Sequence, residues 1–235
     1  MPLVLQPTPS SRFRFGLEIV AAMLVALIVR PLLYTVITPI LYKSDVSSGR
    51  VSWWALYTWI LFWEWMPFGV LWWALRRSGR QWLEVGVDWN YFVRHRTAIV
   101  MTMLIFIIVA FMLPYLLYQG RVPQSSRSFS FLPVTGLERV FFLVAAISGG
   151  ICEEICYRGL PLRLFARTTV QAWLALPAAM VAFVFIHGRF GASLPLFYLL
   201  CGLLDGGIFI FLGRRHLEWL MVAHALYDGW FILAP

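Results

Sequence analysis

The stretch Gly149-Gly150-Ile151-Cys152-Glu153-Glu154-Ile155-Cys156-Tyr157-Arg158-Gly159 places two adjacent carboxylates and an arginine directly after an apolar run, residues 140–147. An ionisable side chain at the centre of a bilayer costs about 2.5 kcal/mol or more, so such side chains persist there mainly as parts of working sites. The stretch therefore predicts a membrane helix that carries a functional site.

The composition of the whole chain supports a membrane protein. Of its 235 residues, 61% are hydrophobic and 13% are charged, whereas soluble domains have about 25% charged residues. The net charge of +8 comes from basic residues in short loops between apolar runs, as membrane orientation requires. Nucleic-acid binding would gather them on one polar face. We therefore expect an all-α polytopic bundle in a lipid bilayer, with no nucleic-acid partner.

Apolar runs of about 20 residues mark the spans. We expect about seven (six to eight) around a polar intramembrane cavity, at roughly 17–42, 51–75, 97–118, 137–158, 172–190, 194–212 and 217–234. Residues 76–96 are expected to form a loop with an interfacial segment on the headgroups. In one integral membrane domain, residues 1–136 would supply N-terminal helices and 137–235 the catalytic core. Lysine and arginine predominate in the alternate loops that place the N-terminus inside, in a bacterial-type plasma membrane.

The two glutamates of the opening stretch have different expected roles. Glu154 and Arg158 are four residues apart, in the order that favours an intrahelical ion pair. Glu153 points about 100° away around the helix and is the better candidate for a general base. The pair Gly149-Gly150 allows close helix approach or local unwinding. Cys152 and Cys156 flank the glutamates and are expected to be small buried apolar residues, with a metal or redox role as the alternative.

Further ionisable residues lie in the later spans. His187 ends an apolar run, and His224 and Asp228 share one helix face, where a carboxylate commonly orients an imidazole. Asp205 lies beside the Gly202-x-x-x-Gly206 close-packing pattern and either packs there or lines the cavity. Separately, Glu64 in the second span is expected to be a packing partner, of Arg30 for example. The seven-span register puts Glu153 and His187 at different depths, so they meet only if a helix is shifted, tilted or broken.

Three of these pieces resemble the motifs of the CAAX-protease and bacteriocin-processing family of intramembrane endopeptidases, which includes the type II prenyl-protein proteases. The pieces are Glu153-Glu154-x-x-x-Arg158, Phe183-x-x-x-His187 and His224-x-x-x-Asp228. Together they cover about residues 137–230 in the family's order. The last motif ends in Asp228, where the prenyl-protein members have Asn, and an aspartate donates a hydrogen bond only when protonated.

The resemblance implies hydrolysis of a peptide bond near the C-terminus of a substrate protein. Glu153 with His187 would activate the attacking water. His224 with Asp228 would polarise the scissile carbonyl, and Glu154 with Arg158 would hold the electrostatics of the site. No cofactor is expected. In the zinc-dependent alternative Glu153, His187 and His224 would be the ligands. The residues that bind substrate and the oligomeric state are not indicated.

Two hypotheses from other classes use the same polar residues. One is a non-catalytic membrane protein that binds a peptide, as in bacteriocin immunity. The other is a transporter or proton pathway, because intramembrane acids and histidines also build proton relays. No inverted internal repeat supports the transporter. Loss of function on changing Glu153 and His187 would separate hydrolysis from binding.

Overall fold

The computed structural model describes residues 17, 18, 21, 53–108, 133, 135–187 and 194–230. Helical elements and their connecting turns account for these residues, and no strand occurs among them, which confirms the all-α class. The elements are α3 (Trp53–Arg77), η2 (Trp82–Val85), α4 (Trp89–Ile107), α6 (Gly136–Glu154), η5 (Ile155–Phe165), α7 (Thr169–His187), α8 (Leu194–Phe211) and α9 (Glu218–Trp230).

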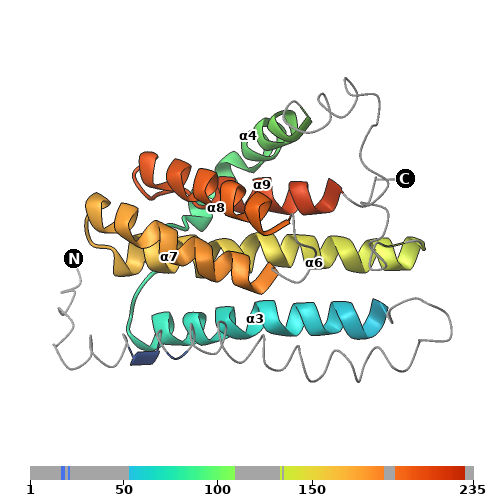
Figure 1. Ribbon diagram of the computed structural model, residues 1–235, viewed down its shortest axis with the longest axis horizontal. Coiled ribbons are helices and arrows are strands. Elements are labelled where there is room, and N and C mark those ends of the chain that lie inside the picture. Colours follow the sequence, from blue (N-terminus) through green and yellow to red (C-terminus); the bar gives the residue numbers. More distant parts are fainter. Residues whose placement is uncertain are drawn as a thin grey trace.

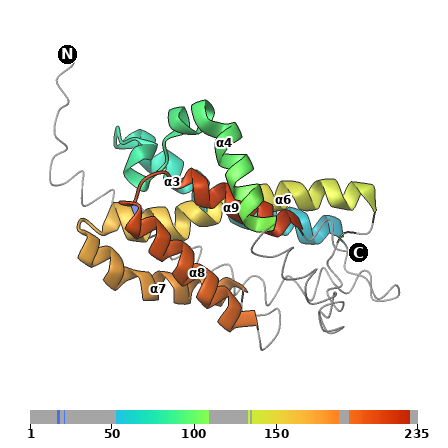
Figure 2. The same cartoon turned by 90° about the horizontal axis from the view of Figure 1, so that it is seen from above.

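The helix formed by α6 and η5 is the central element (Figure 1). It begins at a capping box, in which Thr135 and Glu138 satisfy each other's backbone N–H groups, as expected at a helix N-terminus. α3 packs along one side of α6 and α9 along another, while α4 packs on α9. α7 packs on both α8 and η5. Figure 2 shows α7 and α8 on the side of the molecule away from α4. The central helix therefore touches most of the other described helices.

The central helix changes character immediately after the second glutamate. From Ile155 to Phe165 it is a π-helix, with Pro161 inside it, and π-helical turns occur frequently at functional sites. The helix ends seven residues beyond the predicted end at Arg158. At that end the Arg214 guanidinium donates hydrogen bonds to the carbonyl oxygens of Ala166 and Leu162, at 2.5 and 3.3 Å. Arg214 thus satisfies carbonyls that a helix end leaves open.

Glycines set two of the close helix contacts. A Cβ on Gly150 would lie 2.5 Å from the Met221 carbonyl oxygen of α9. A Cβ on Gly206 of α8 would lie 2.3 Å from Cδ1 of Leu176 of α7. At Gly150 the close atom belongs to the α9 backbone, so that position needs glycine, whereas at Gly206 it is the flexible end of a side chain. The close-packing role expected of Gly206 is confirmed. The helix is continuous through Gly149-Gly150. Of the two roles expected for this pair, the close approach of another helix is therefore observed and local unwinding is not.

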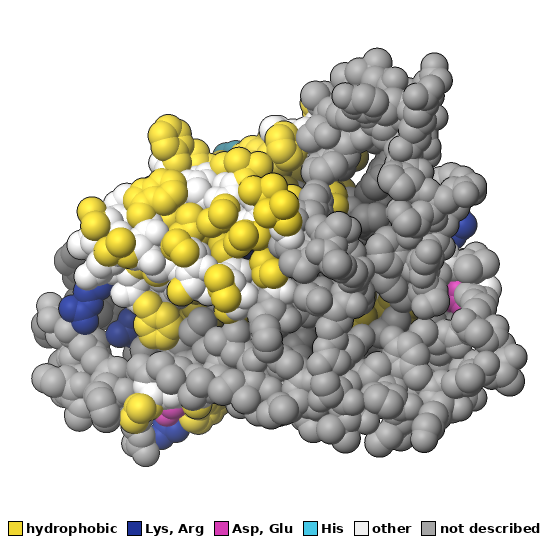
Figure 3. All heavy atoms as spheres, in the orientation of Figure 1, with side chains coloured by type: hydrophobic (Ala, Val, Ile, Leu, Met, Phe, Trp, Pro, Cys, Tyr) yellow, Lys and Arg dark blue, Asp and Glu magenta, His cyan; other side chains and the backbone are white. Residues whose placement is uncertain are grey.

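Among the described residues, one helix is long and apolar enough to cross a membrane, the continuous helix Gly136–Phe165. Thr169–Val184 and Tyr198–Phe211 are shorter apolar helices. Hydrophobic side chains gather on the face shown in Figure 3, and the large exposed ones on α7 and α8 are Val170, Trp173, Leu174, Val181, Leu196, Leu200, Leu204, Ile208 and Phe211. An apolar outer face suits contact with lipid. The number of spans and the division at residue 136 stay predictions.

The expected interfacial loop at 76–96 is wrong in part. α3 continues to Arg77, and α4 already begins at Trp89, capped by the Asp88 side chain. Asp88 accepts the Tyr91 N–H at 2.9 Å, which fixes that helix start. The connection between the two helices is therefore residues 78–88 with the short helix η2. Most of the first expected span and the second half of the third lie outside the described residues.

Candidate active site

The structure brings together ionisable side chains from three elements. Glu153 and Glu154 lie in the last turn of α6, Arg158 in the first turn of η5, and His224 and Asp228 on α9. Glu153, Glu154 and Arg158 are buried, with exposed fractions of 6%, 0% and 1%. Buried charges are costly unless they are paired, so their partners define the site.

Glu154 stands at the centre of the cluster. Its Oε1 atom lies 3.0 Å from Nη1 of Arg158 and 2.8 Å from Nδ1 of His224. The first contact is the expected ion pair across one helical turn, and the second joins α6 to α9. A carboxylate at Nδ1 places a proton on that nitrogen and orients the ring, which leaves Nε2 of His224 facing the other acids.

Nε2 of His224 faces two carboxylates. Oδ2 of Asp228 lies 3.3 Å from it and Oε2 of Glu153 lies 4.0 Å from it. The Asp228 contact is the expected one across a helical turn, but Glu154 is the nearer carboxylate to the ring. The Glu153 distance is longer than a hydrogen bond. Glu153 is thus close to the imidazole without being bonded directly to it.

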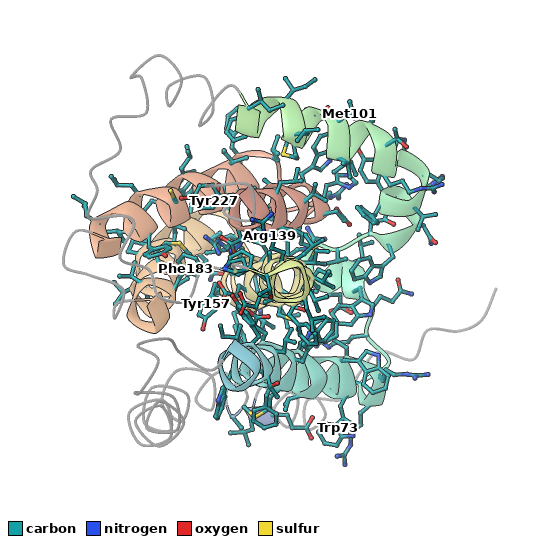
Figure 4. The ribbon with its side chains drawn as sticks, turned by 90° about the vertical axis from the view of Figure 1, so that its right-hand side faces the viewer. Trp73, Met101, Arg139, Tyr157, Phe183 and Tyr227 are labelled. Atoms are coloured by element: carbon teal, nitrogen blue, oxygen red, sulfur yellow. The ribbon has the colours of Figure 1, made fainter. Side chains whose placement is uncertain are left out.

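The aromatic ring of Phe183 packs on the buried arginine. The guanidinium carbon of Arg158 lies 4.3 Å from the ring centroid of Phe183 on α7, a cation–π contact that a desolvated site strengthens. The Phe183 centroid lies 5.6 Å from that of Tyr157 and 6.3 Å from that of His224. Figure 4 looks along α6 and labels Tyr157 and Phe183. Asp205 of α8 completes the surroundings, with Oδ2 3.9 Å from Nη2 of Arg158.

His187 is the last residue of α7, and its side chain lies outside the described residues. Phe183 is one turn earlier on the same helix and contacts both Arg158 and His224. The end of α7 therefore reaches the depth of the glutamates. α7 runs through Pro177 as one helix. The described residues contain no group of three His, Cys, Asp or Glu side chains that could hold a metal ion.

Sequence reasoning missed Glu64 of α3 as a neighbour of the site. Glu64 is 6% exposed, and its Oε1 atom would lie 3.4 Å from a Cβ placed on Gly149. Its expected partner, Arg30, lies outside the described residues. The tryptophan-rich second span contains no motif that points to Glu64. The one signal in the sequence was that Glu64 is the single acidic residue of an apolar run. Cys152 and Cys156 are buried free thiols, which fits the apolar reading.

Residues 135–230 match a family model described as type II CAAX prenyl endopeptidase Rce1-like. The match contains all three sequence motifs and confirms the resemblance drawn from them. This is an integral membrane family whose members cleave protein substrates. No curated protein and no solved structure matches the chain significantly.

Proposed function

With the CAAX prenyl endopeptidase match as the premise, we propose that this protein is an intramembrane endopeptidase of the glutamic type. It cleaves a peptide bond near the C-terminus of a substrate protein. One observation carries the proposal: His224 is held at Nδ1 by Glu154 while its Nε2 faces Glu153 and Asp228. An oriented imidazole beside a second carboxylate supplies both a hydrogen-bond donor and a base.

Glu153 is the general base. It takes a proton from a water molecule whose oxygen bonds to the scissile carbonyl carbon, with help from His187. When the tetrahedral intermediate collapses, the C–N bond breaks and Glu153 returns the proton to the leaving nitrogen. The products are a carboxylic acid and an amine; the proton of the acid then passes to the amine, so the protons balance. General acid–base help of this kind contributes about 10²–10⁴ in rate.

His224, with a proton on each ring nitrogen, stabilises the negative oxygen of the intermediate by donating from Nε2. Its 2.8 Å contact with Glu154 supports this role, because Glu154 holds Nδ1 and thereby directs Nε2 toward the reacting groups. Asp228 positions the ring from the next turn. Arg158 compensates the charge of Glu154 in a fully buried pair. A donor of the His224 kind is worth about 10²–10³ in rate.

The zinc-dependent version of the same peptidase is the second candidate. A carboxylate on the far nitrogen of an imidazole is also the arrangement that orients a zinc-ligating histidine, and Glu154 occupies that place on His224. Glu153, His187 and His224 would hold the ion, which would supply a Lewis acid and activate water. The buried Arg158 beside these carboxylates disfavours a further dication.

The test is hydrolysis by purified protein reconstituted in liposomes. The substrates are membrane-anchored peptides with C-terminal CAAX sequences, prenylated and unprenylated, and mass spectrometry identifies the fragments. We expect cleavage by the wild type and by Glu138→Gln, whose buried carboxyl lies at the other end of α6, and none by His224→Ala. Binding without cleavage would favour the peptide-binding protein. Loss in strong chelator, restored by zinc, would favour the metal enzyme.

A further inference from the structure

Four arginines gather where the central helix ends, and they form the arginine cluster. Arg163 lies in η5, Arg167 follows the end of η5, and Arg214 and Arg215 lie in the turn between α8 and α9. Nη1 of Arg163 donates a hydrogen bond to the carbonyl oxygen of Arg214. Nη2 of Arg214 donates one to the carbonyl oxygen of Arg167 at 3.4 Å. Tertiary contacts thus bring two distant segments of the sequence together in one basic site.

Backbone contacts hold two members of the arginine cluster and leave the other two available. Nε of Arg163 donates to the carbonyl oxygen of Leu83 at 2.8 Å, and Arg214 caps the carbonyls at the end of η5. Arg167 and Arg215 are exposed. Within the described part of the chain, neither of their guanidinium groups has a hydrogen-bond or ion-pair partner. Arg167 and Arg215 can therefore bind a ligand from outside.

The positive charge of the arginine cluster is not compensated by an ion pair with any described carboxylate. Arg163 is repelled by both Arg214 and Arg215, and the acid that attracts it is Glu84. Glu84 forms its own ion pair with Arg80 at 2.7 Å. Like charges that a fold holds together create a positive potential that attracts anions. The arginine cluster is therefore suited to an anionic group.

The surroundings of the arginine cluster are those of a membrane surface. The helix Gly136–Phe165 has 30 residues and measures up to about 45 Å, the thickness of a bilayer with its headgroups. Its end therefore lies at the level of the headgroups. Large apolar side chains are exposed beside the cluster, with Phe211 at 85% and Leu212 at 54% exposure. Figure 3 shows basic side chains at one end of the apolar face.

We propose that the arginine cluster binds the phosphate group of an anionic phospholipid, whose acyl chains contact Phe211 and Leu212. Arg167 and Arg215 donate charge-assisted hydrogen bonds to the phosphate oxygens, for which the guanidinium fork is well shaped. The other two arginines add positive potential. α7 begins at Thr169, next to Arg167, and the dipole of this helix also favours an anion there. None of these residues belongs to the proposed catalytic group, so binding does not depend on peptide hydrolysis.

The test measures lipid binding to the purified full chain in a neutral detergent. Native mass spectrometry counts bound lipids, and thermal unfolding reports the stabilisation that binding produces. The probe is phosphatidylglycerol, and zwitterionic phosphatidylcholine is the comparison. We expect phosphatidylglycerol to raise the wild-type transition temperature more than phosphatidylcholine does. The double variant Arg167→Gln/Arg215→Gln should bind phosphatidylglycerol at least about tenfold more weakly, because a hydrogen bond to a charged group contributes that factor or more. Wild-type affinity in this variant would overturn the proposal.

A matched control separates a specific site from general attraction to a basic surface. Arg94→Gln/Arg96→Gln removes the same charge from exposed arginines of α4 that bond to carbonyls of their own helix. This control should keep wild-type affinity for phosphatidylglycerol, and an equal loss in both double variants would overturn the site. Stabilisation by inorganic phosphate as large as that by phosphatidylglycerol would overturn the lipid as its source. If the double variant of the cluster does not fold, Arg215→Gln alone repeats the comparison against Arg94→Gln.

Discussion

Substitution of Gly150 by alanine should separate the two helices that build the site. The new Cβ would lie 2.5 Å from the carbonyl oxygen of Met221 and 2.9 Å from the backbone nitrogen and Cβ of Ala225. Ordinary van der Waals contact begins near 3.4 Å, so α9 must move by about 1 Å from α6. The nearest atoms belong mostly to the α9 backbone, so no side-chain rotation relieves the clash.

That movement acts directly on the catalytic contacts. α9 carries His224, whose Nδ1 lies 2.8 Å from Oε1 of Glu154 on α6, and a shift of about 1 Å takes this pair beyond hydrogen-bond distance. Overpacking of this kind costs about 1–3 kcal/mol of stability. Misplacement of a catalytic group by 1 Å lowers the rate by about 10²-fold. We expect both effects in Gly150→Ala.

The assay compares kcat and the thermal transition of the variant with those of the wild type in the same detergent. Gly69→Ala is the matched control, because Gly69 is also helical but a Cβ there would meet nothing within 4 Å. We expect the control to keep wild-type activity and stability. Wild-type kcat in a stable Gly150→Ala protein would refute the reasoning, since the close approach of α6 and α9 would then not position His224.

Three more substitutions test other contacts. Glu154→Gln leaves Arg158 buried without its ion-pair partner at 3.0 Å, so unfolding by heat or denaturant should show a loss of about 3–5 kcal/mol; an unchanged transition would contradict the pairing. Gly206→Ala meets Cδ1 of Leu176 at 2.3 Å, the flexible end of a side chain, and thermal scans should therefore place it between Gly150→Ala and the control in stability. Arg214→Ala removes the hydrogen bonds to Leu162 and Ala166 and should cost about 1.5–3 kcal/mol, measured by the same scans, whereas Arg214→Lys should recover part of it.

The local part of the site could be predicted from the sequence because it follows helical periodicity. Glu154 and Arg158, like His224 and Asp228, are four residues apart, and a helix brings such pairs to one face. The apolar runs around them predict helices for the same reason. The all-α class and the close packing at Gly206 followed from these patterns, and the family match agrees with the motifs.

Contacts between distant helices could not be predicted in this way. The carboxylate nearest to His224 is Glu154 and not Asp228. Glu154 and His224 lie 70 positions apart in the sequence. Their meeting depends on how closely Gly150 lets α9 approach. Glu64 reaches the site only because α3 pairs with α6 in one register. No periodic pattern indicated that the helix turns π-helical after Glu154, so the predicted end at Arg158 was too early.

The central claim is that Glu153 activates water for peptide hydrolysis beside His224. The most direct measurement is kcat of the wild type and of Glu153→Gln in metal-stripped buffer, in isotopically labelled water, with the thermal transition of both proteins recorded. We expect label in the new carboxylate made by the wild type, and a loss of kcat of about 10²-fold or more in Glu153→Gln at unchanged stability. Cleavage by a stably folded Glu153→Gln at the wild-type rate would contradict it.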